Sequence, residues 1–75
     1  MKIEMNGLNT GWFGLNICLR PEEINQLLEN LIELREQSLG HFHIRSSWPE
    51  DQGDGIADIE FSIIGDGETE NATID

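Results

Sequence analysis

Residues 21–40, PEEINQLLENLIELREQSLG, decide the fold of this 75-residue chain. Pro21 suits the first position of a helix, where its missing N–H has no partner to lose, and the two glutamates that follow it favour the positive end of the helix dipole. Apolar side chains recur at the spacing of one buried stripe, namely Ile24, Leu27, Leu28, Leu31 and Leu34. Gly40 is a natural stop. The segment predicts a helix over residues 21–38 whose apolar side needs a sheet to cover it.

Strand patterns lie on both sides of this helix. Before it, apolar and polar residues alternate over 1–6 and 12–20, around a turn bracketed by glycines, which predicts an antiparallel hairpin. After it, residues 41–46 and 56–64 alternate in the same way, separated by a loop over 47–55 rich in Pro, Gly and Asp. The order ββαββ predicts an α+β two-layer sandwich, with the helix packed on one face of a mostly antiparallel sheet of four or five strands.

The length leaves room for one small domain. We expect residues 1–65 to form this domain and residues 66–75 to form an acidic C-terminal tail, with a short fifth edge strand at 72–74. A core this small gives modest stability.

Acidic residues dominate the composition. The chain has 15 Asp and Glu against 4 Lys and Arg, a net charge of −11. Phosphate groups would be repelled by this surface, which argues against nucleic-acid binding. The same charge would steer the chain onto a basic protein.

The compartment is predicted from cysteine usage and hydropathy. Cys18 is the single cysteine, so no intrachain disulfide can form, and a secreted domain of this size usually needs one. No apolar run approaches the roughly 20 residues of a membrane span. We therefore expect a cytoplasmic protein that does not enter a membrane.

Two short polar patterns are expected to meet on the uncovered face of the sheet. His41 and His43 share one face of their strand, and Asp58 and Glu60 share one face of the next. If these strands pair, the four side chains become neighbours and could ligate a divalent metal such as Zn²⁺. The alternative is cross-strand charge pairing, with Arg45 and protonated histidines against the carboxylates.

Signals for catalysis are weaker. The chain looks too small to build a deep substrate pocket, so we expect neither an enzyme nor a bound cofactor. Cys18 could act as a nucleophile activated by His41 or His43 across the sheet, although a lone cysteine in a strand is more often inert.

The two tryptophans are candidate contacts for a partner. Trp12 is predicted on the open sheet face and Trp48 in the loop, and exposed tryptophan is enriched at binding hot spots. The alternative is that each ring folds over a sheet edge and covers the thin core.

Three segments carry a resemblance to a known group of proteins. They are Arg20-Pro21-Glu22-Glu23-Ile24, His41-Phe42-His43-Ile44 and Gly55-Ile56-Ala57-Asp58-Ile59-Glu60-Phe61. Over residues 20–64 the chain resembles small bacterial proteins grouped with polymorphic-toxin immunity proteins. The resemblance implies a compact domain that binds and neutralises a cognate toxin and has no catalytic activity.

These observations together predict a non-catalytic protein-binding module, an immunity-like inhibitor that occludes a basic toxin or nuclease. The predicted partner-binding residues are Trp12, His41, His43, Arg45, Trp48, Asp58 and Glu60. Pairing of sheet edges into a homodimer stays open. Two alternative functions also stay open: a metal-binding small domain, and an acidic mimic of nucleic acid. All of them require the helix to cover only one face of the sheet.

Overall fold

The computed structural model describes residues 1–46 and 55–75. In these ranges the elements are β1 (Lys2–Gly7), β2 (Phe13–Cys18), α1 (Pro21–Arg35), β3 (His41–Arg45) and β4 (Asp58–Ser62). This order confirms the predicted α+β class and the sequence ββαββ. The predicted loop, with Trp48, lies outside the described residues except for Gly55.

Strands β1 and β2 form the predicted antiparallel hairpin. Ile3 pairs with Ile17 and Met5 with Leu15, so the apolar side chains of both strands share one face. The turn is closed by the N–H of Leu8, which donates to the carbonyl of Trp12 at 3.0 Å.

The core lies between α1 and the β3–β4 hairpin. Phe42 and Ile44 on β3 and Leu34 on α1 are its buried members among the described residues, each less than a tenth exposed. The ring of Phe42 stacks on that of Phe61, its cross-strand neighbour on β4, with centroids 4.8 Å apart. The alternation that buries Phe42 and Ile44 turns the histidines of β3 to the opposite face.

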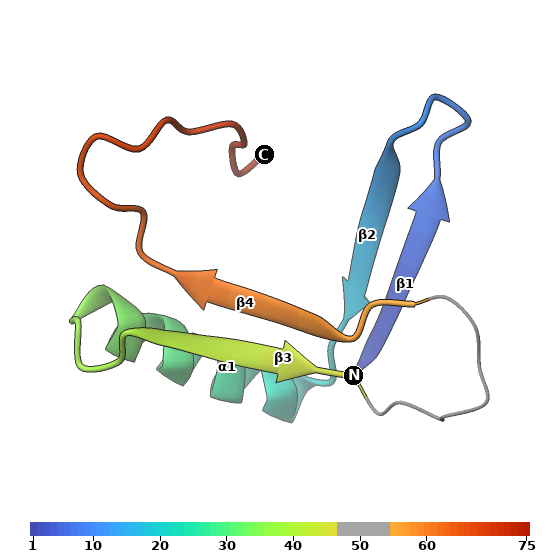
Figure 1. The fold of residues 1–75 in the computed structure, drawn as a ribbon. Coiled ribbons are helices and arrows are strands. Elements are labelled where there is room, and N and C mark those ends of the chain that lie inside the picture. The colour runs from blue at the N-terminus through green and yellow to red at the C-terminus, as the bar shows by residue number, and fades with distance from the viewer. Residues whose placement is uncertain (47–54) are drawn as a thin grey trace.

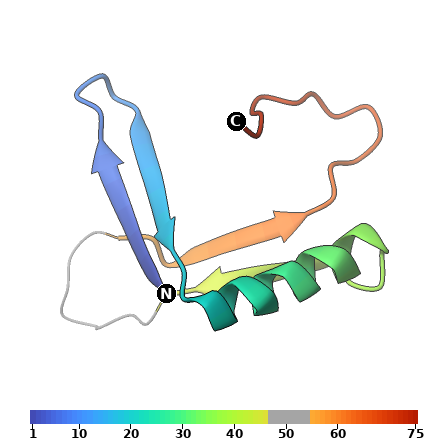
Figure 2. The ribbon, with the colours of Figure 1, turned by 180° about the vertical axis from the view of Figure 1, so that it is seen from behind.

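The prediction of one sheet with four or five strands is wrong. The described strands form two separate two-stranded sheets, β1–β2 and β3–β4, and residues 72–74 form no fifth strand. Figures 1 and 2 show α1 lying along the β3–β4 hairpin, while the β1–β2 hairpin projects away from them at an angle. Strands β1 and β2 pair only with each other and β3 and β4 only with each other, so the alternation predicts each hairpin correctly but not the joining of the two hairpins.

The predicted buried stripe of α1 is therefore only partly buried. Leu34 is buried and Leu27 half-buried, but Ile24, Leu28 and Leu31 are exposed. The helix has the predicted apolar side. The described strands, however, do not form the single sheet that was expected to cover that whole side.

The helix ends at Arg35, earlier than the predicted residue 38, and the cause is a Schellman motif. Ser38 donates its backbone N–H to the carbonyl of Glu33, and Gln37 donates to that of Leu34, both at 3.0 Å. These bonds place Gln37 in the left-handed region at φ 63°. Gly40, the predicted stop, lies beyond the motif.

Replacing Gln37 by glycine is expected to stabilise the chain by about 0.5–1 kcal/mol. A side chain in the left-handed region costs about 1–2 kcal/mol, and the extra backbone entropy of glycine offsets part of the gain. Urea unfolding followed by far-UV circular dichroism measures the change. Gly40→Ala is the matched control, because a Cβ there meets no atom within 4 Å and the φ angle is not positive. A lower midpoint for Gln37→Gly would contradict the assignment of the cap.

Candidate functional site

The polar face of the β3–β4 hairpin brings together five of the predicted site residues, and we call it the histidine face: His41, His43, Arg45, Asp58 and Glu60. The register sets His43 directly opposite Glu60 and Arg45 directly opposite Asp58. The predicted pairing of these two strands, and the neighbourhood of their polar side chains, is confirmed.

His43 is held by a carboxylate on each side of its ring. Its Nδ1 atom lies 2.9 Å from both carboxylate oxygens of Asp58, and its Nε2 atom lies 3.5 Å from Oε1 of Glu60. An ionised carboxylate only accepts hydrogen bonds, so Nδ1 must carry the proton it shares with Asp58. In the neutral imidazole this leaves the lone pair on Nε2, facing Glu60.

The other two members of the histidine face flank this group. The ring of His41 stands perpendicular to that of His43, with centroids 5.1 Å apart. The Nε atom of Arg45 lies 3.8 Å from Oδ1 of Asp58, and its side chain is largely exposed. The predicted cross-strand charge pairing therefore forms between Arg45 and Asp58, at the exposed end of the hairpin, where such a pair contributes little to stability.

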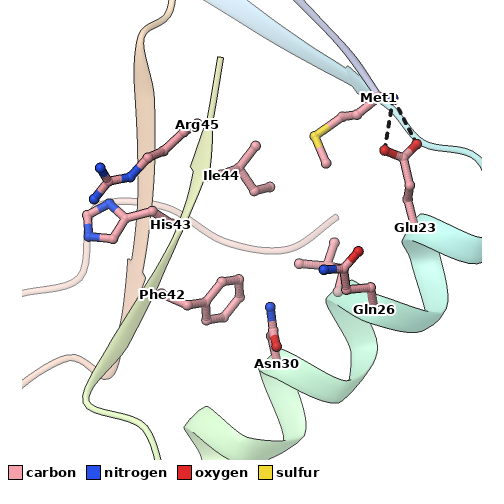
Figure 3. A pocket seen from close by; sticks show the side chains of 9 residues that line it. Met1, Glu23, Gln26, Asn30, Phe42, His43, Ile44 and Arg45 are labelled. Carbon is pink, nitrogen blue, oxygen red and sulfur yellow. Dashed lines mark hydrogen bonds and ion pairs between the residues drawn. The ribbon is translucent and has the colours of Figure 1, made fainter. Parts of the chain in front are cut away.

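On its other side β3 borders a shallow groove of about 180 Å³ against α1. Figure 3 shows Phe42 and Ile44 pointing toward the helix, and His43 and Arg45 pointing away from it. Glu23 closes one end of the groove. The ammonium group of Met1 donates to its carboxylate at 2.9 Å, and this contact, followed by the hydrogen bond from the backbone N–H of Arg20, lowers the pKa of Glu23.

The projecting β1–β2 hairpin carries a second candidate surface, which we call the hairpin tip: Leu8, Trp12 and Phe13. Trp12 is 76% exposed and Phe13 is 64% exposed. These are exposed apolar side chains near the end of the hairpin, and exposed aromatic rings are enriched at protein-binding sites. Trp12 is thus exposed as a binding residue must be, but the prediction that it lies on the open sheet face is wrong, since it lies in the turn before β2 and away from the sheet of the histidine face.

Sequence reasoning missed the exposure of Phe13. Its alternation with Leu15 and Ile17 is that of a buried strand face, and the sequence holds no signal that this face lacks a cover. The suggested activation of Cys18 by a histidine across the sheet is wrong, since Cys18 lies on β2 and both histidines on the separate β3.

Neither a family model, nor a curated protein, nor a solved structure matches this chain. Within the described ranges, no helix has the length and apolar character of a membrane span.

Proposed function

We propose that this chain is a non-catalytic protein-binding module that occludes a basic protein, in the manner of an immunity protein that neutralises a toxin or nuclease. The observation that carries the proposal is the uncovered β1–β2 hairpin. An isolated two-stranded hairpin is marginally stable in water, and this one presents an apolar face and an aromatic tip to solvent. A partner that packs against it would supply the cover that the other residues of 1–46 and 55–75 do not.

The open shape supports this proposal. The accessible surface is 6739 Å², against about 4,700 Å² for a compact protein of this mass. The radius of gyration is 14.6 Å, against about 11 Å for a compact chain of this length. Part of the surplus belongs to residues 63–75.

Charge decides what kind of partner is proposed. A second copy of the chain would bring another net charge of −11 to the interface, which opposes association. A basic protein is attracted instead by the large excess of acidic residues in the chain. Toxins that act on nucleic acids are basic for the same electrostatic reason.

The test has two stages. Tagged chain captures proteins from the cells that express it, and each captured protein is then purified and titrated calorimetrically at about 0.05 and 0.5 M NaCl. We expect a basic protein that binds 1:1, loses affinity as salt rises, and loses its own toxic or nuclease activity in proportion to its occupancy.

Three outcomes would overturn the proposal. The captured protein could keep its activity at saturation, or its affinity could be independent of salt. Alternatively, light scattering on the purified chain could give twice the monomer mass, with the hairpin protected from hydrogen exchange, which would identify a second copy as the occupant.

A further inference from the structure

We propose that the histidine face binds one divalent transition-metal ion of the zinc class, with His41, His43 and Glu60 as ligands and Asp58 as the group that orients His43. This inference is independent of the proposed function, because it concerns the β3–β4 sheet and not the hairpin tip, and it needs no partner. It also revises the set of four ligands expected from the sequence. Asp58 contacts Nδ1 of His43, whereas the proposed ligand atom of His43 is Nε2.

The distances support three ligands. One donor atom from each of His41, His43 and Glu60 lies within 4.8 Å of the others. Donor atoms in a tetrahedral zinc site stand about 3.3 Å apart, given metal–nitrogen distances of about 2.0–2.1 Å. His43 Nε2 and Glu60 Oε1 are already 3.5 Å apart. His41 is exposed at the start of β3, so its ring can turn toward the other two without displacing core residues.

Asp58 supplies a second, independent observation. A histidine that ligates a metal almost always donates its other ring N–H to a carboxylate or carbonyl, which fixes the tautomer and the orientation of the ring. The two contacts of 2.9 Å between His43 Nδ1 and Asp58 hold this arrangement before any metal arrives. In the neutral imidazole with its proton on Nδ1, Nε2 and a Glu60 oxygen are two acceptors that lie 3.5 Å apart, and a cation between them would satisfy both.

The donor set selects the metal. Two imidazoles favour Zn²⁺, Ni²⁺ or Cu²⁺ over Mg²⁺ and Ca²⁺, which prefer oxygen ligands. Three protein ligands on an exposed face leave a further coordination position open to water or to a side chain of another molecule. Arg45 lies 3.8 Å from Asp58 on the side away from His41 and does not occupy the position between the ligands.

Calorimetric titration of the tag-free chain with ZnCl₂ tests the site. A parallel titration with MgCl₂ tests a cation that prefers oxygen ligands. We expect one Zn²⁺ per chain and no heat from Mg²⁺. His41→Ala and Glu60→Gln should each weaken Zn²⁺ binding by more than about 100-fold, and Asp58→Asn by about 10–100-fold, as is typical when the group that orients a ligand is removed. Glu29→Gln, which removes an exposed carboxylate from α1, is the matched control and should bind as the wild type does.

The visible spectrum of the Co²⁺-loaded chain gives a readout of geometry that does not depend on affinity. An intense absorption typical of tetrahedral coordination is expected for wild type and Glu29→Gln, and its loss is expected for His41→Ala. Circular dichroism identifies a variant that fails to fold, in which case Glu60→Gln alone decides. The proposal is overturned if the wild type gives no heat with Zn²⁺, or if Glu60→Gln binds as tightly as the wild type.

Discussion

Phe42→Ala is expected to lower the free energy of unfolding by about 3–5 kcal/mol, the range typical of truncating a buried phenylalanine. Phe42 is one of three buried hydrophobic residues in the described part of the chain, and its ring stacks on Phe61. The truncation therefore removes the contact that joins the two strands to the helix. Small domains have stabilities near the lower end of the usual 5–15 kcal/mol, so a loss of this size leaves only about 0–2 kcal/mol.

Urea unfolding by far-UV circular dichroism, repeated in the stabilising osmolyte trimethylamine N-oxide, keeps a folded baseline for the weakened variant. Ile63→Ala is the control, because Ile63 is an exposed isoleucine immediately after β4 and should change the free energy of unfolding by less than about 1 kcal/mol. If Phe42→Ala unfolds at the same urea concentration as the wild type, the core does not lie between α1 and β3.

The contrast between Phe42 and Phe13 shows how far the sequence determines the fold. Both residues sit in strands with the same alternation of apolar and polar side chains. The pattern correctly gives the strand, its face and its hairpin partner, because these follow from local periodicity and short turns. Whether that face is covered depends on where the helix axis lies relative to each hairpin, and no local pattern encodes this. Phe42 faces α1, whereas Phe13 faces solvent.

The same limit explains the result for the candidate site. The grouping of His41, His43, Asp58 and Glu60 followed from their period of two and from one pairing of strands, so it could be predicted. The different contacts of the two carboxylates, Asp58 with Nδ1 of His43 and Glu60 with Nε2, could not be predicted. They depend on the register, which sets Glu60 directly opposite His43 and Asp58 on the diagonal, and this register is not fixed by a long connecting loop.

Trp12→Ala is expected to weaken binding of the proposed basic partner by about 30-fold, or about 2 kcal/mol, the threshold of a hot spot. Trp12 is 76% exposed at the end of the projecting hairpin, so its ring can enter a partner's pocket without rearrangement of the core. The stability of the free chain should not change, because the substitution keeps the backbone carbonyl that accepts from Leu8 and closes the turn.

A comparison with Ile74→Ala separates a specific contact from general loss of apolar surface. Ile74 is fully exposed in the C-terminal segment, so its truncation also removes an accessible hydrophobic side chain but leaves the hairpin tip intact. Calorimetric titration of the purified partner should therefore give the wild-type affinity for Ile74→Ala and the 30-fold loss for Trp12→Ala. Equal affinities for both variants would mean that the partner docks elsewhere, and the high exposure of the aromatic tip would then need another physical explanation. If the loss of affinity in Trp12→Ala disappears at high salt, Trp12 contributes to the electrostatic part of binding and not through burial of its ring. Burial of an apolar ring does not weaken as ionic strength rises.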